Sequence, residues 1–247
     1  MRLLTAHRPL RQTLGRIRYH AQLGLLNGLR YGRHLGRRSS LRLGGAIVLW
    51  FAVLSLSFFV LVRGSMYAYQ SMGWGTWSSI GLGMFGTALV FSAYLAWLWT
   101  HLTGEGRMRQ FLPRALIVLV AGYSMYGLLY LSSGNSRDPE MREYYSSLHP
   151  LMRLGASTYF LFDRNGVVTD LERTAEDYLG MGLSMDETSL HFKLADRYVH
   201  AMDLRTTGRS ARRNSVTAAY FQLMGFQSLH HVSAADHLHV SLPVSRP

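Results

Sequence analysis

Three short motifs in the last quarter of the chain carry side chains that could bind a metal ion. They are Ser189-Leu190-His191, Ala201-Met202-Asp203-Leu204 and Asp236-His237-Leu238-His239-Val240. An imidazole, a carboxylate and a second imidazole form the donor set of a hydrolytic zinc site, which leaves one position open for water. The sequence has no cysteine, so any metal must be held by histidine and carboxylate.

The final motif has the alternation of a β-strand. A period of two places His237 and His239 on one face and Leu238 and Val240 on the other, so both imidazoles could reach one point. Residues 140–247 as a whole predict a small α+β domain. Its expected elements are a helix over 149–162 with a strand alternative over 159–162, a turn at 163–166, a strand at 167–169, a helix at 174–181, a strand at 198–204, a helix at 215–224 ended by Gly225, and a strand at 237–242.

Three apolar segments precede this domain, namely Gly45–Val62, Ser79–Trp99 and Ala115–Leu131. Each is uncharged and close to the roughly 20 residues that cross a bilayer, so we expect three transmembrane helices. Ten arginines and no acid lie in residues 1–44, and three more arginines lie between the second and third segments. The positive-inside rule then predicts a cytoplasmic N-terminus and a domain that faces the periplasm or the exterior.

The charge distribution also bears on partners. Residues 1–133 carry fourteen arginines and one acid, whereas residues 134–247 carry twelve basic and thirteen acidic residues. The basic excess thus belongs to the apolar half, which argues for membrane lipid and against nucleic acid as the partner. The expected organisation is an Arg-rich cytoplasmic tail (1–44), a membrane domain (45–133) and an extracytoplasmic domain (134–247). The tail is read either as an interfacial amphipathic helix or as a solvated segment that only fixes topology.

The motifs of the domain resemble those of the LAS-type zinc peptidases, the group of lysostaphin, D-Ala-D-Ala carboxypeptidases, murein endopeptidases and the hedgehog fold. The shared pattern is Ser-x-His, then Ala-x-Asp-Leu, a helix ending in Gly-Phe, and a last strand with His-x-His. The resemblance covers roughly residues 148–243 and leaves the membrane half unexplained. It implies a small antiparallel sheet that holds Zn2+.

The resemblance also implies roles for individual residues. His191, Asp203 and His239 would hold the zinc, and His237 would act as general base, with Asp236 as the alternative base. Two departures from the pattern stand out. Eleven residues separate His191 from Asp203, where six are usual, and Val199 replaces a glycine. If the extra residues do not form a hairpin extension, Asp196 and His200 are the fallback ligands.

Arg173 has two interpretations. Its guanidinium could grip a substrate carboxylate or an oxyanion, or it could form a surface ion pair with Glu176 or Asp177. The whole chain likewise supports two hypotheses. The first is a membrane-anchored zinc metallopeptidase that cuts peptidoglycan peptides. The second is a catalytically inactive accessory subunit of a membrane protein complex, which binds a membrane-protein partner through its spans.

Overall fold

The structure is a computed structural model that describes residues 45, 48–49, 51–103, 112–180, 182, 184, 189–232 and 236–243. The chain divides into two compact units, Met1–Ala52 and Val53–Pro247. The predicted Arg-rich tail lies outside the described residues. All the contacts discussed below lie within the second unit.

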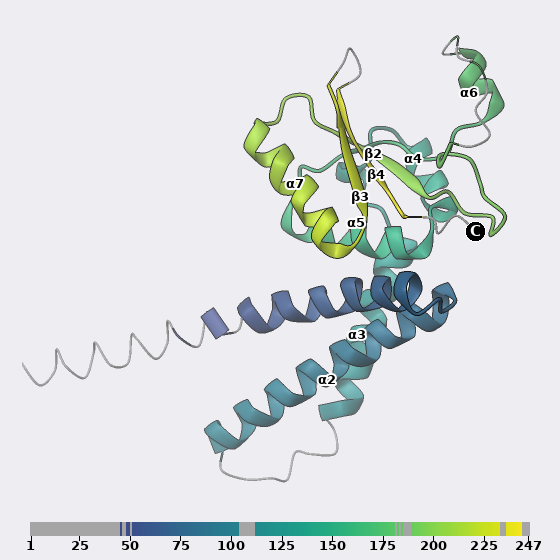
Figure 1. Cartoon of the computed structure of the whole chain (residues 1–247). Coiled ribbons are helices and arrows are strands. Elements are labelled where there is room, and N and C mark those ends of the chain that lie inside the picture. Colours follow the sequence, from purple (N-terminus) through teal and green to yellow (C-terminus); the bar gives the residue numbers. More distant parts are fainter. Residues whose placement is uncertain are drawn as a thin grey trace, which may run out of the picture. The chain divides into compact units, whose positions relative to one another are not determined.

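The apolar half forms three helices in the described part of the chain. They are the Phe51–Ser71 helix, α2 (Thr76–Thr103) and α3 (Leu112–Leu129) (Figure 1). Only two of their apolar runs, Phe51–Ser71 and Thr76–Leu98, are long enough to cross a membrane. The expectation of three full-length spans is therefore met for two. The third apolar run, Leu116–Leu129, falls short of the roughly 20 residues that a span needs.

The first two helices approach each other closely at a glycine. A Cβ atom at Gly83 of α2 would lie 2.1 Å from the Ser65 hydroxyl oxygen and 2.4 Å from the Leu61 carbonyl oxygen. Only a residue without a side chain fits there, as in many packed membrane helices. The neighbouring Thr87 donates a hydrogen bond to the Ser57 carbonyl oxygen at 3.1 Å, which ties the same two helices together.

The C-terminal region is the predicted α+β domain. Its elements are η2 (Ser133–Asn135), α4 (Glu140–Glu143), η3 (Tyr144–Ser147), α5 (Pro150–Phe162), β1 (Val168–Asp170), α6 (Ala175–Gly180), β2 (Ala201–Arg205), α7 (Ala211–Met224), β3 (Gln227–His231) and β4 (His237–Ser241). The four strands form an antiparallel sheet in the order β1-β2-β4-β3. Helix α7 contacts β3 and β4, and α5 contacts α7 (Figure 1).

The predicted helices owe their ends to recognisable caps. His149 caps α5 by accepting a hydrogen bond from the Leu151 backbone N–H, and Pro150 occupies the first helical position. Ser210 caps α7, which ends at Gly225 with φ of 100°. The strand alternative over 159–162 is wrong, because those residues complete α5.

The predicted turn at 163–166 is present, and its glycine is required for packing and not for a positive φ. Gly166 is outside the left-handed region, and a Cβ there would lie 2.5 Å from the Tyr159 ring. The turn is instead closed by Asp163, whose carboxylate accepts a hydrogen bond from the Asn165 N–H. The glycine is therefore needed for close packing beneath the turn.

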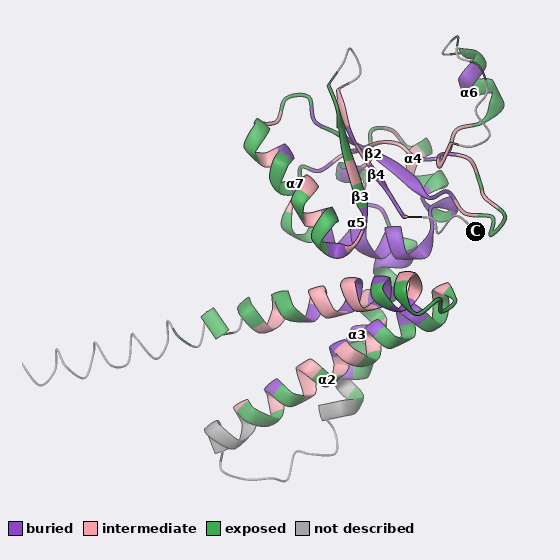
Figure 2. Ribbon diagram, viewed as in Figure 1, coloured by how far each residue is buried: buried purple, intermediate pink, exposed green. Residues whose placement is uncertain are grey.

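One hydrophobic core joins the sheet to the apolar helices. Met202 and Leu204 of β2 lie opposite Val240 and Leu238 of β4, and all four are buried. The same cluster continues into the apolar helices through Leu61, Val62, Met66, Ile80, Leu128 and Leu131 (Figure 2). The core-facing sides of β2 and β4 are thus fixed, and their opposite sides are left to form the site.

Candidate metal centre

The sheet register brings two of the predicted ligands together. Asp203 of β2 lies directly opposite His239 of β4. Directly opposed residues in an antiparallel pair point to the same face. That face is turned away from the core that Met202 and Leu238 occupy, because side chains alternate along each strand. The alternation predicted from the sequence of β4 is therefore confirmed.

The third ligand comes from the loop before β2, where the Ser-x-His motif has a structural role. The Ser189 hydroxyl oxygen accepts a hydrogen bond from the His191 N–H at 3.3 Å. His191 Nδ1 donates to the Leu171 carbonyl oxygen at 2.6 Å. A carbonyl only accepts, so this bond fixes the tautomer and leaves the Nε2 lone pair of the neutral ring directed at Asp203 and His239.

The donor atoms form a compact triangle. His191 Nε2 lies 3.3 Å from His239 Nδ1 and 3.4 Å from Asp203 Oδ1, and the third edge, His239 Nδ1 to Asp203 Oδ1, is 2.8 Å. Zinc bound tetrahedrally at its usual bond lengths separates neighbouring ligand atoms by about 3.3–3.5 Å. Two edges already have that length, and the third differs by about half an ångström. The residues present therefore fit a zinc ion.

The surroundings of Asp203 favour a charged carboxylate that can bind a cation. Asp203 and His191 are each 3% exposed, whereas the His239 side chain is 23% exposed, so the site opens on the side of β4. Burial alone would raise the pKa of the Asp203 carboxyl. The neighbouring imidazoles of His191 and His239 outweigh this effect and hold the pKa well below its ordinary value.

Arg173 lies at the metal centre, but it does not serve as an exposed receptor for an anion. Its Nε donates to Asp170 at 2.6 Å, and its Nη2 donates to Asp203 Oδ2 at 3.2 Å. Burial would lower the pKa of the guanidinium, but the Asp170 carboxylate keeps it above its ordinary value. The surface pair with Glu176 or Asp177 is not formed. Arg173 orients the free oxygen of Asp203 and so directs Oδ1 to the triangle.

The two candidate bases occupy different positions. His237 lies on the same face as His239, with Nε2 3.6 Å from Asp203 Oδ2, and its side chain is 25% exposed. Asp236 lies at the start of β4, where it accepts hydrogen bonds from the Thr206 hydroxyl at 2.6 Å and from His230 Nε2 at 2.7 Å. Of the two, only His237 borders the donor triangle.

His231 belongs to no motif that predicts a role, yet it lies beside the site. It lies opposite His237 in the β3–β4 pair, and the two rings stack with centroids 4.9 Å apart. Its ring is also 6.1 Å from that of His239. Strand β3 was missed because its side chains are mostly exposed and do not alternate. The sequence did contain a signal for this strand. The preceding helix stops at Gly225, and a segment of strand length follows before the chain turns back to form β4.

The extra residues between His191 and Asp203 do not move either ligand. Lys193 and Val199 form an isolated bridge, so the insertion is a short hairpin-like excursion. The fallback ligands Asp196 and His200 lie elsewhere and form a second group with His149. In that group the His149 Nδ1 lone pair accepts from the Leu151 N–H, which places the ring proton on Nε2, toward Thr76. A metal would have to break both contacts, so we assign this second group a structural role.

Comparisons with known proteins identify no relative, so the function has to be inferred from the geometry of the site. No protein-family model, curated protein or solved structure matches this chain. The resemblance to LAS-type peptidases therefore stays a prediction from the sequence motifs.

Proposed function

We propose that the protein is a membrane-anchored zinc peptidase that hydrolyses stem or cross-link peptides of peptidoglycan on the outer side of the plasma membrane. The observation that carries the proposal is the donor triangle of His191, Asp203 and His239, with edges of 2.8–3.4 Å and a fixed His191 tautomer. The choice of peptidoglycan follows from the resemblance of the motifs.

The residues around the triangle support hydrolysis. His191, Asp203 and His239 would hold a zinc ion, which would supply a water with a pKa of about 7 and a positive charge for the developing oxyanion. His237 lies on the open side of the site, where it would accept a proton as general base. His231 stacks on His237 and limits its rotation. Arg173 holds Asp203 in the orientation that the metal requires.

The second candidate, an inactive accessory subunit, has one observation in its favour. The apolar helices share the hydrophobic core of the domain through residues such as Leu61 and Leu128, which is more contact than a simple anchor needs. A subunit that transmits a partner's position to the domain would be built in this way. The intact triangle favours the peptidase.

Zinc stoichiometry and hydrolysis of the full-length chain separate the two candidates. The protein is purified in detergent, stripped with a chelator and reloaded, and its metal content and activity on peptidoglycan stem peptides are measured. The peptidase predicts one zinc per chain and activity that disappears in Asp203→Ala. His230→Ala, which changes an exposed histidine outside the triangle, is the matched control. A wild-type protein that binds no zinc would refute the proposal, and zinc binding without hydrolysis would favour the accessory subunit.

A further inference from the structure

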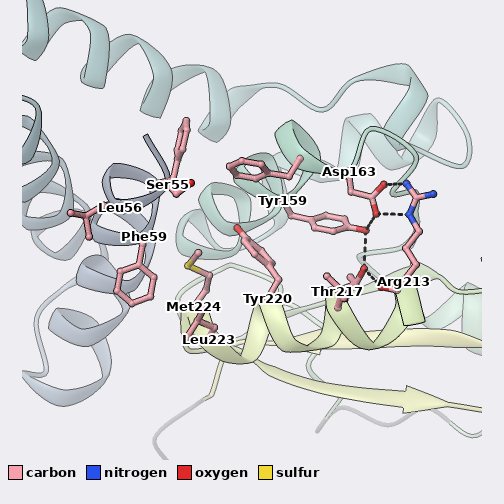
Figure 3. Close-up of a pocket in the computed structure, with 13 residues that line it drawn as sticks. Ser55, Leu56, Phe59, Tyr159, Asp163, Arg213, Thr217, Tyr220, Leu223 and Met224 are labelled. Carbon is pink, nitrogen blue, oxygen red and sulfur yellow. Dashed lines mark hydrogen bonds and ion pairs between the residues drawn. The ribbon is translucent and has the colours of Figure 1, made fainter. Parts of the chain in front are cut away.

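A pocket of about 670 Å³ lies away from the metal centre, beside the Phe51–Ser71 helix (Figure 3). None of its lining residues belongs to the metal centre. One wall is the Ser55–Phe59 part of the helix, and the other is the face of α7 that carries Val216, Tyr220 and Leu223. Its volume lies within the usual range for small-molecule sites.

The lining is apolar and remains open at its rim. Leu56, Phe162, Val216 and Leu223 are 48–64% exposed, although each is a large hydrophobic residue. In Figure 3 the side chains of Phe59, Tyr220 and Met224 face one another across the pocket. One of the two walls is a helix long and apolar enough to cross a membrane. An acyl chain is the apolar occupant that such a helix would meet in a bilayer, and it matches the apolar lining of the pocket.

The opposite end of the pocket is polar and carries an excess of positive charge. Asp163 accepts ion pairs from both Arg209 and Arg213, so one carboxylate faces two guanidinium groups. Tyr159 and Thr217 add hydroxyl groups at the same end. The Arg213 side chain is 42% exposed and so can reach a further anion. An apolar cavity that ends in one uncompensated positive charge matches a lipid with an anionic headgroup.

We propose that this pocket binds one anionic membrane phospholipid, with an acyl chain between the Phe51–Ser71 helix and α7 and the phosphate beside Arg213. The Arg-rich residues 1–44 are a poorer occupant, because their charge has the same sign as the excess in the pocket. The proposal rests on the membrane location of the helix and is independent of the metal centre.

Spin-labelled lipids test the proposal on the full-length protein in phosphatidylcholine nanodiscs. Phosphatidylglycerol or phosphatidylcholine with a nitroxide on the acyl chain is added, and the motionally restricted fraction is measured by electron paramagnetic resonance. The wild type should restrict phosphatidylglycerol in preference to phosphatidylcholine. Val216→Trp and Leu223→Trp, which fill the pocket from exposed positions, should abolish that restricted fraction.

Two arginines of α7 provide a matched pair for the headgroup. Arg213→Gln should lower the preference for phosphatidylglycerol about fivefold, the scale of one cationic side chain at an anionic surface. Arg212→Gln removes a neighbouring charge that does not line the pocket and should leave the preference unchanged. Unaltered thermal unfolding and zinc content show that each variant is folded, independently of lipid binding.

Several results would overturn the proposal. A restricted fraction that survives both tryptophan variants places the lipid elsewhere, and equal effects of Arg212→Gln and Arg213→Gln reduce the effect to general surface charge. A signal that appears only after residues 1–44 are deleted would make that segment the occupant. Tryptophan variants that dissociate a dimer would make it a second copy of the chain.

Discussion

His237 and His239 stand two residues apart on β4 and face the same side, yet their surroundings give them different tasks. His239 Nδ1 lies within the donor triangle, whereas His237 lies next to the second oxygen of Asp203. We therefore expect His239→Ala to lose zinc together with activity. We expect His237→Ala to keep zinc while turnover falls by about 10²–10⁴, as for the loss of a general base. Metal analysis and steady-state kinetics of the two variants measure this difference.

Two other outcomes for the zinc content of His237→Ala and His239→Ala would contradict these roles. Equal loss of zinc from both would make His237 a ligand. Full zinc content in both would show that β4 does not bind metal, and the accessory role would then be the better explanation. Thermal unfolding of the chelator-treated variants controls for damage to the fold.

Arg173 allows a second test at single-residue resolution. Because its guanidinium holds the oxygen of Asp203 that faces away from the triangle, Arg173→Gln should weaken zinc binding about 10–100-fold, the usual effect of losing a partner of a metal ligand. Competition with a chromogenic chelator gives the affinity. Lys193→Gln, which breaks the exposed pair with Glu172, should change it little. An unchanged affinity in Arg173→Gln would instead favour the substrate-binding role predicted from the sequence.

Much of the site could be predicted from residue types and order. The alternation in β4 placed both histidines on one face, and the structure brings His191, Asp203 and His239 together despite the unusual spacing. The position of Arg173 was harder to predict, because its partners Asp170 and Asp203 depend on how β1 pairs with β2. His231 could not be assigned without the register of β3, since a single exposed histidine has no local signal.

Helix α5 begins at a buried histidine whose titration should be measurable. Burial, and then the nearby His200, lower the pKa of His149 from 6.5 to about 3, although Asp196 opposes the shift. Arg153 also lowers it, and the rings of Tyr69 and Tyr198 pack against it. The folded ring therefore stays neutral over a range in which the unfolded chain takes up a proton. Stability should be complete above about pH 6.5 and fall as the pH decreases toward 3.

His149→Asn isolates this contribution, because asparagine also caps a helix but does not titrate. Between pH 7 and pH 4.5 the variant should lose less free energy of unfolding than the wild type, by up to about 1.4 kcal/mol per pH unit below 6.5. Thermal unfolding of the metal-free full-length protein is the measurement, since zinc would add its own proton linkage. Parallel pH dependences in the two proteins would show that His149 does not titrate differently on folding.

The sequence predicts an element well where neighbouring residues determine it. It predicts an element poorly where contacts with distant parts of the chain determine it. The helix predicted at 174–181 begins at Thr174, a favourable capping residue, which exchanges hydrogen bonds with Asp177 in a reciprocal cap. The segment 132–139 has the polar, Gly- and Pro-containing composition that is typical of a linker. It is instead packed against the domain, because the Asn135 amide donates to the carbonyl oxygens of Arg164 and Gly166. Nothing local to Asn135 indicates those distant partners.

The arrangement of the three helix ends bears on the topology of the whole molecule. Gln70 donates to the Gly225 carbonyl oxygen, Thr76 contacts His149, and Arg153 donates to the Leu128 carbonyl oxygen. The end of the first helix, the start of α2 and the end of α3 therefore all contact the domain. At about 1.5 Å per residue the apolar run of α3, Leu116–Leu129, extends about 21 Å, which is less than the roughly 30 Å of the hydrocarbon layer.

Two crossings and three crossings predict different positions for the domain. With the Phe51–Ser71 helix and α2 alone in the membrane, both ends of the chain would lie on one side. With α3 as a third span, the domain would lie opposite the N-terminus, for which the ten arginines of residues 1–44 predict a cytoplasmic location by the positive-inside rule. The segment between α2 and α3 carries Arg107 and Arg109, and three crossings place it in the cytoplasm as well.

Protease treatment of sealed cells with a permeabilised outer envelope distinguishes these topologies. We expect the protease to cleave the C-terminal domain and to spare an N-terminal tag, because only three crossings separate the two by the membrane. Lysis with detergent is the control and should expose both. Protection of both ends before lysis would mean that α3 does not cross, and the domain would then be cytoplasmic. Cleavage of the tag with protection of the domain would reverse the orientation and place the metal centre away from peptidoglycan.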